Sequence, residues 1–132
     1  MWLQTHIIMK DEIRVLVVDD NDINCFLLNH IINAKFKAKI DTAADGKEAL
    51  EFAERYEYDI IFMDIEMPVM NGIESAKHMK EDLGITTPIV FVSAYLIENI
   101  QINYPEFDAD TPMCNKPVKA QCITDFIFQA TS

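Results

Sequence analysis

The sequence predicts an α/β fold, a doubly wound five-stranded parallel sheet with helices on both faces. Short continuous apolar runs such as residues 13–18 (IRVLVV) alternate along the chain with segments whose apolar residues recur at helical spacing. Continuous β-branched runs are typical of strands buried on both faces, and strands that alternate with helices form right-handed crossovers within a parallel sheet. A length of 132 residues indicates a single domain with a sizeable core.

The first half of the chain supplies two strands and two helices. The run at 13–18 stops at Asp19-Asp20-Asn21, an N-capping cluster, and a helix is expected over 22–34. A short run at 39–43 follows as the second strand. Asp45-Gly46 then opens a second helix.

The second half supplies the other elements. Residues 59–63 form an apolar strand that ends on Asp64, and Asn71-Gly72 precedes a helix expected over 72–83. Pro105 limits the short helix after the fourth strand, because proline cannot continue a helix. The remaining expected elements are a strand at 88–92, a helix around 96–100, a brief strand at 113–115 and a helix over 118–130.

Composition excludes several classes of function. The net charge is −11, from 22 acidic and 11 basic residues, which argues against a direct nucleic-acid or anionic-membrane partner. No apolar run approaches the ~18 residues of a membrane span. Cys25, Cys114 and Cys122 are odd in number and lack CxxC spacing, so we expect reduced thiols in a reducing, cytoplasmic compartment. Residues 1–10 are expected to form an extension outside the core, and 11–132 the domain.

Chemically active side chains stand where the predicted strands end. In a parallel sheet these ends are neighbours, and ligands bind beyond them. Crowded carboxylates repel one another unless a cation neutralises them, and Mg²⁺ prefers such hard oxygen ligands. A carboxylate is also a nucleophile that can form an acyl phosphate. The residues at this edge are Asp19, Asp20, Asp64, Ser93 and Lys116.

Four segments in order carry a resemblance to a known family. VLVVDDNDIN, IIFMDIEMPVMNG, PIVFVSA and NKPV look like the signature segments of the receiver domain of two-component response regulators, a flavodoxin-like (CheY-like) fold. The match extends over most of residues 12–130, and the set of four is highly specific. DDNDIN resembles most closely the receiver modules of hybrid sensor histidine kinases.

The resemblance implies a role for each of these residues. Asp64 would be the phosphoacceptor, and Asp19, Asp20 and Asp64, with the backbone carbonyl of Glu66, would hold Mg²⁺ or Mn²⁺. Ser93 would be the switch hydroxyl. Lys116 would contact the phosphoryl group and precede a cis proline. The implied partners are a histidine kinase or histidine phosphotransfer domain, docking near the first helix, and a downstream protein.

One departure from the family pattern keeps alternatives open. Met113 stands where receivers usually place an aromatic residue, and Tyr104 and Phe107 are out of register. A flexible thioether could fill that position without a two-state rotamer. One alternative is therefore a phosphorylation-independent scaffold. Another is an aspartyl phosphatase, in which Glu66 would act as general acid. We expect no enzyme acting on a separate substrate.

Overall fold

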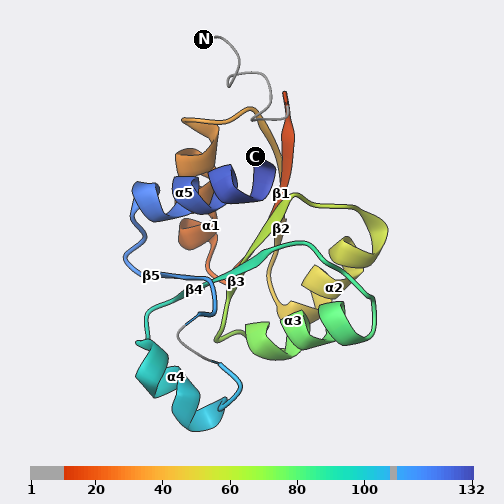
Figure 1. Ribbon diagram of the computed structural model, residues 1–132, viewed down its shortest axis with the longest axis vertical. Helices are drawn as coiled ribbons and strands as arrows, with labels where there is room; N and C mark the ends of the chain where they lie inside the picture. Colours follow the sequence, from red (N-terminus) through yellow and green to blue (C-terminus); the bar gives the residue numbers. More distant parts are fainter. Residues whose placement is uncertain (1–10, 108–109) are drawn as a thin grey trace.

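The computed structural model describes residues 11–107 and 110–132, and it confirms the predicted fold. Five parallel strands form one sheet in the order β2-β1-β3-β4-β5, with helices between them (Figure 1). The prediction for residues 1–10 lies outside the described residues. The elements are β1 Ile13–Val18, α1 Asp22–Asn33, β2 Ala38–Ala43, α2 Gly46–Arg55, β3 Ile60–Asp64, α3 Gly72–Glu81, β4 Ile89–Ser93, α4 Ile97–Asn103, β5 Met113–Asn115 and α5 Ala120–Thr131.

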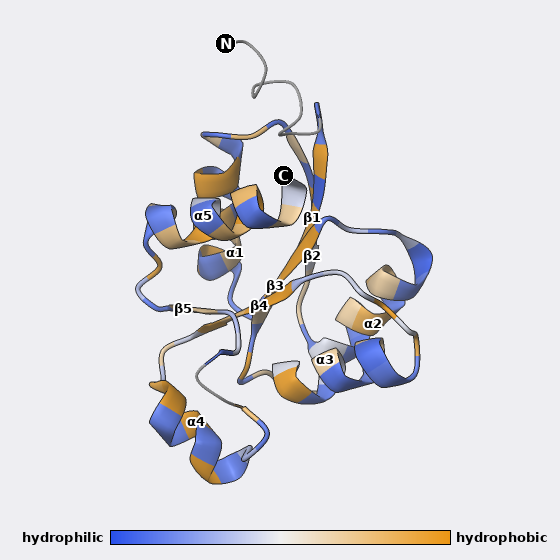
Figure 2. Ribbon diagram, in the orientation of Figure 1, coloured by the Kyte–Doolittle hydropathy of each residue, from blue (hydrophilic) through white to orange (hydrophobic). Residues whose placement is uncertain are grey.

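The sheet separates two apolar clusters. Along β1, Leu16 and Val18 face α2, α3 and α4, whereas Val15 and Val17 face α1 and α5. Successive side chains of a strand point to opposite faces, so a strand covered on both sides must be apolar throughout. Figure 2 shows the hydrophobic strands running between the helical layers. Both faces of the sheet are therefore buried, and only its edges and strand ends are available to ligands.

Three helices begin at side-chain caps that the sequence supplies. Asn21 accepts hydrogen bonds from the backbone N–H groups of Ile23 and Asn24, and Asp45 accepts one from Glu48 N–H. The side chain of Asn71 accepts a hydrogen bond from Glu74 N–H at the start of α3. Each cap satisfies a backbone donor that has no partner within its helix. These caps fix where the chain turns at the carboxyl edge of the sheet.

The apolar residues that predict α1 do not all face the core. Leu28 and Ile32 are buried, whereas Ile23 and Phe26 are 76% and 73% exposed. The apolar stripe in the sequence is wider than the face that α1 turns toward β1 and α5. The helix was correctly predicted, and part of its apolar side is surface.

The expectation of three reduced thiols is wrong for two of them. Cys114 and Cys122 form a disulfide, and Cys25 is the free cysteine. Cys114 lies on β5 and Cys122 in the first turn of α5, eight residues later. Their spacing matches no sequence motif because the fold, not the local sequence, lays the start of α5 beside β5. Among the described residues, no helix is long and apolar enough to cross a membrane.

Candidate functional site

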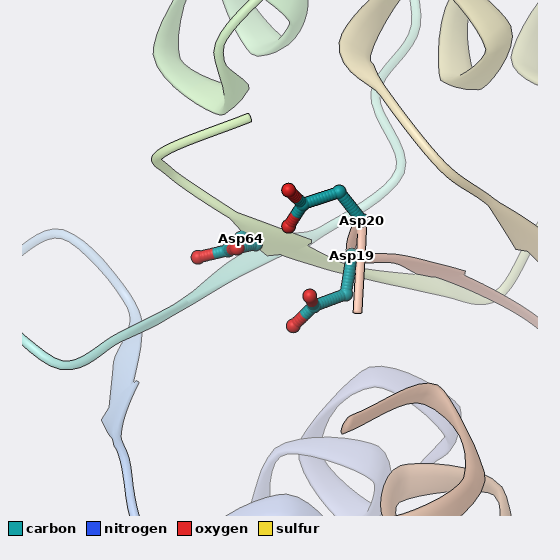
Figure 3. Close-up of side chains that lie close together, drawn as sticks. All are labelled: Asp19, Asp20 and Asp64. Atoms are coloured by element: carbon teal, nitrogen blue, oxygen red, sulfur yellow. The ribbon is translucent and has the colours of Figure 1, made fainter. Parts of the chain in front are cut away.

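Three carboxylates converge at the carboxyl ends of two adjacent strands. Asp64 is the last residue of β3, and Asp19 and Asp20 directly follow β1, which pairs with β3. One oxygen from each carboxylate lies within 4.8 Å of the others. Figure 3 shows the three side chains directed to the same side of the strand ends. The convergence predicted from the strand ends is thus observed.

Asp19 is held in place and Asp20 is open to solvent. Asp19 is only 3% exposed, and its Oδ1 accepts a hydrogen bond from Asn21 N–H at 2.9 Å. Asp20 is exposed. The cluster therefore combines fixed inner carboxylates with an outer one that remains hydrated, an arrangement suited to an ion that keeps some of its water.

Lys116 brings a positive charge to the cluster from β5. Its Nζ lies 3.0 Å from Asp19 Oδ2 and 3.4 Å from Asp64 Oδ1. Burial acts to lower the pKa of Lys116, but its hydrogen bond to Asp19 and the charge of Asp64 together raise that pKa. The ammonium group is therefore charged at neutral pH. The Lys116–Pro117 peptide is cis, as expected from the sequence.

The site carries more negative than positive charge. Three carboxylates face one lysine, and the pKa of Asp64 rises to about 6. Burial is the largest cause, the charge of Asp19 adds to it, and Lys116 opposes it. One hydrogen bond, from Ile65 N–H to Asp64 Oδ1 at 2.9 Å, stabilises the ionised form. A divalent cation would relieve this repulsion, and carboxylate oxygens are the ligands that Mg²⁺ prefers.

Ser93 and Glu66 stand beside the cluster. Ser93 ends β4, is 1% exposed, and its Oγ accepts a hydrogen bond from Tyr95 N–H at 3.0 Å. Its carbonyl accepts a hydrogen bond from Lys116 N–H at 2.8 Å, which joins the ends of β4 and β5. Glu66 is exposed, two residues after Asp64. The metal-binding role of its backbone carbonyl stays a prediction.

A polar contact that the sequence did not reveal connects α3 and α4. The Nδ2 of Asn71 donates to the hydroxyl of Tyr104 at 2.9 Å and to Glu74 Oε1 at 2.7 Å. Asn71 is the N-cap residue of α3, and Tyr104, 33 residues later, is the C-cap residue of α4. The Asn-Gly pair signals only a local break in structure, so this long-range contact has no signature in the sequence.

A close backbone approach was also missed. A Cβ added to Gly72 would lie 2.0 Å from the carbonyl oxygen of Asp64. The Gly72 N–H donates to Ile65 O at 2.8 Å. The loop between β3 and α3 thus closes directly behind the Asp64 backbone, and only glycine fits there.

Met113 occupies the first position of β5 and packs into the core. It is half-buried beside the cluster that includes Phe91 and Phe107, whose rings lie 5.3 Å apart. Phe107 is 3% exposed, so its ring is buried. The position where receivers usually have an aromatic residue is therefore occupied by the half-buried side chain of Met113.

The fold and the site together define a class: a small parallel α/β domain that collects acidic residues and one lysine beyond its strand ends. The family described as the response regulator receiver domain matches residues 15–128. The chain belongs to this family. It is a receiver domain of two-component signalling, of the kind carried by hybrid sensor kinases. The acids and lysine expected of a receiver are all in place, and no observation favours the scaffold alternative.

Curated relatives are much longer than this chain. The autoinducer 2 sensor kinase/phosphatase LuxQ of Vibrio parahaemolyticus is 33% identical over 116 residues, which is 88% of this chain and 13% of LuxQ. The osmosensing histidine protein kinase SLN1 of Saccharomyces cerevisiae is 35% identical over 91 residues, 65% of this chain and 8% of SLN1. This chain thus spans about an eighth or less of either relative's length.

Solved structures agree with the fold. The chemotaxis response regulator CheY4 of Vibrio cholerae superposes with a TM-score of 0.75 at 26% identity, over 90% of this chain and 98% of CheY4. The receiver domain of the sensor histidine kinase PA1611 of Pseudomonas aeruginosa, whose structure holds a magnesium ion in its active site cleft, has a TM-score of 0.78. It is 24% identical over 89% of this chain and 96% of that domain, and supports the fold alone.

Proposed function

We propose that Asp64 accepts a phosphoryl group from a phosphohistidine in a Mg²⁺-dependent reaction. A carboxylate oxygen of Asp64 attacks the phosphorus, the nitrogen–phosphorus bond of the donor breaks, and the imidazole nitrogen keeps the electron pair. The product is an acyl phosphate on Asp64. The observation that supports this proposal is the close grouping of Asp19, Asp20 and Asp64, with Lys116 between two of them.

The side chains suit a divalent metal ion. Asp19, Asp20 and Asp64 would hold Mg²⁺ or Mn²⁺ with the backbone carbonyl of Glu66, because all are hard oxygen donors. The ion would neutralise charge on the transferred group. Ionised Asp64 is the nucleophile, and burial first and the charge of Asp19 second raise its pKa to about 6. A bound cation would favour the ionised form.

Lys116 and Ser93 act on the incoming phosphoryl group from the other side. The Lys116 ammonium lies 3.4 Å from Asp64 Oδ1 and would contact a phosphoryl oxygen there. The Ser93 hydroxyl accepts from Tyr95 N–H and keeps its own proton to donate to the phosphoryl group. Movement of Ser93 would shift the β4–α4 loop and so bias a two-state equilibrium that a downstream protein partner reads.

The donor is a histidine kinase or a histidine phosphotransfer domain. Two exposed apolar residues of α1, Ile23 and Phe26, follow Asp20 by three and six positions in the helix that begins next to the acidic pair. A donor helix docked on them could bring its imidazole to Asp64. We propose residues 11–132 as the receiver unit and the cytoplasm as its compartment. The chain has no enzymatic role beyond its own phosphorylation and dephosphorylation.

The test is phosphorylation by acetyl phosphate with Mg²⁺, followed by intact-mass analysis. We expect one added phosphoryl group, which requires both Mg²⁺ and Asp64. Asp64→Asn should abolish the adduct. Asp41→Asn, in the middle of β2 with Arg14 and Tyr58 as partners, is the matched control and should keep it. An adduct of equal yield on Asp64→Asn, or no adduct on a folded, Mg²⁺-binding wild type offered a phosphohistidine donor, would refute the proposal.

A further inference from the structure

A disulfide spans the segment that carries Lys116. Cys114 is the middle residue of β5, and Cys122 lies in the first turn of α5. The residues between them include Lys116 and the cis Pro117. The disulfide therefore closes a short covalent loop, and one residue of this loop is Lys116, which contacts Asp19 and Asp64.

Noncovalent contacts hold the β5 end of this segment better than its α5 end: Asn115 Nδ2 donates to Tyr95 O at 3.1 Å, and Lys116 Nζ lies 3.0 Å from Asp19 Oδ2. β5 has three residues and lies at the edge of the sheet, where it pairs only with β4. The start of α5 has no side-chain cap: Lys119, its N-cap residue, makes no capping hydrogen bond. On the backbone, Lys116 N–H donates to Ser93 O at 2.8 Å, and Cys122 N–H donates to Lys119 O at 3.1 Å. The covalent bond thus supplies a constraint that hydrogen bonding at this helix start does not.

The two sulfur atoms differ in access. Cys114 is 1% exposed, whereas Cys122 is half-buried and reaches the surface. An external thiolate can attack the Cys122 sulfur and release the Cys114 thiolate, which takes up a proton. The second thiol of the reductant then resolves the mixed disulfide. The balance is two electrons and two protons from a dithiol, which gives two cysteine thiols and one oxidised dithiol.

The backbone permits both states. The Cα atoms of Cys114 and Cys122 are 6.1 Å apart, within the range of roughly 4.4–6.8 Å that disulfides span. Two thiols fit at that separation without movement of the sheet. Cys25, on α1, packs against the same apolar cluster as Cys114, and its Sγ donates to Asp19 O at 3.4 Å. The bond joins Cys114 to Cys122 and leaves Cys25 as the free thiol.

We propose that Cys114 and Cys122 form a reversible thiol–disulfide site that sets how firmly the Lys116 segment is held against the acidic cluster. The oxidised pair clamps β5 to the start of α5. Reduction by a dithiol, a small molecule or a protein of that chemical class, releases the clamp and loosens the segment at 115–121. The site is a covalent regulator adjacent to the acids, separate from phosphoryl chemistry.

The first test counts thiols in the full chain. The protein is equilibrated with mixtures of oxidised and reduced dithiothreitol, denatured in an alkylating reagent and weighed. We expect one label, on Cys25, in oxidising mixtures and three in reducing ones, with a reversible transition between them. Three labels at every ratio, one label at every ratio, or a disulfide-linked dimer would each overturn the proposal.

The second test measures the clamp by hydrogen exchange. After reduction, amides at 115–121 should exchange about tenfold faster or more, while those of β1 are unchanged. Cys122→Ser should show the fast exchange under both conditions, and the control Cys25→Ser should respond as the wild type does. Equal exchange rates at 115–121 in the oxidised and reduced wild type would contradict the proposal. This comparison uses the wild type alone and so does not depend on whether a variant folds. Any effect of the disulfide on phosphorylation rests on the proposed function. Thiol counting and hydrogen exchange do not involve phosphate, so the redox proposal and the phosphorylation proposal can fail independently.

Discussion

The two ends of the sheet both gather carboxylates, but they treat them differently. Toward the amino end, Asp41 reaches from the middle of β2: it accepts a hydrogen bond from Tyr58 Oη at 2.7 Å and pairs with the Arg14 guanidinium at 3.4 Å. Arg14 also lies over the Tyr56 ring, 4.1 Å from its centroid. Asp59 accepts a hydrogen bond from Arg14 N–H at 2.8 Å. At the carboxyl end, three carboxylates face Lys116.

The difference separates a structural cluster from a reactive one. At the amino end, each of these carboxylates has a hydrogen-bond or ion-pair partner. The group with the raised pKa is Tyr58, through burial first and then Asp41. At the carboxyl end, the group with the raised pKa is a carboxylate, Asp64, whose pKa rises to about 6. Carboxylates that are paired with a donor or cation belong to the structure of the fold. A crowded group of carboxylates with a perturbed pKa is instead a candidate binding site. Each of the following predictions tests this contrast.

The largest effect is expected from breaking the amino-end cluster. Asp41→Ala leaves Arg14 without its ion partner and Tyr58 without an acceptor, so the free energy of unfolding should fall by about 2–3 kcal/mol. Urea denaturation measures this. Asp11→Ala removes an exposed carboxylate just before β1 and is the control. Its free energy of unfolding should change by no more than about 0.5 kcal/mol. Equal losses in the two variants would mean that the cluster is not structural.

Mg²⁺ should stabilise the folded chain through the carboxyl end. At 100 times its Kd, an ion that binds only the folded state adds about 2.7 kcal/mol to the free energy of unfolding. Asp20→Asn should reduce that gain because it removes the exposed carboxylate of the cluster. Thermal unfolding with and without Mg²⁺ measures it. Asp41→Asn should keep the full Mg²⁺ gain, and if it loses the gain as Asp20→Asn does, the ion is not bound where we place it.

Removing the Asp64 charge should stabilise the metal-free protein. At pH 7, Asp64→Asn removes the cost of burying a charge and its repulsion from Asp19, and we expect a gain of about 1–2 kcal/mol. The rise in pKa from 3.8 to about 6 corresponds to about 3 kcal/mol, but Lys116 loses a partner. The change is opposite in sign to that of Asp41→Ala. A loss of stability in Asp64→Asn without metal would show that Asp64 is a satisfied charge like Asp41.

The same pKa gives the smallest effect, a pH dependence of about 1 kcal/mol. Folding raises the pKa of Asp64 from 3.8 to about 6, so between these values the folded chain binds more protons at this site than the unfolded chain. The contribution of Asp64 to stability therefore falls as pH rises through that window. The measurement is the difference in unfolding free energy between wild type and Asp64→Asn, at about pH 5.3 and pH 7 without metal. A difference that does not change with pH would contradict the assignment.

The sequence predicted the carboxyl-end site better than the amino-end cluster. Each acid of the site directly follows an apolar strand, and parallel strands necessarily bring their ends together, so Asp19, Asp20 and Asp64 could be placed without coordinates. Arg14 and Asp41 meet because β1 and β2 pair in a particular register, and no local pattern encodes that register.

The features that the sequence missed share this cause. The Asn71–Tyr104 hydrogen bond and the Cys114–Cys122 disulfide both depend on how an element lies against another element that follows it. The exposed part of α1 cannot be read from the sequence for a related reason. Hydrophobicity marks Ile23 and Phe26 as apolar but does not say how wide the buried face of the helix is. Hydrophobic periodicity locates the helices and strands, but tertiary packing determines which of their faces is buried.

The contact between Lys116 and Asp19 joins residues 97 positions apart. A ribosome makes the chain from its amino end, so the acids at the ends of β1 and β3 leave the exit tunnel well before the lysine that contacts two of them. During that interval the nascent sheet has its carboxylates without this counter-charge, and dissolved cations and water must screen them. The positive charge of Lys116 reaches the acids only when β5, made after β1 and β3, joins the edge of the sheet.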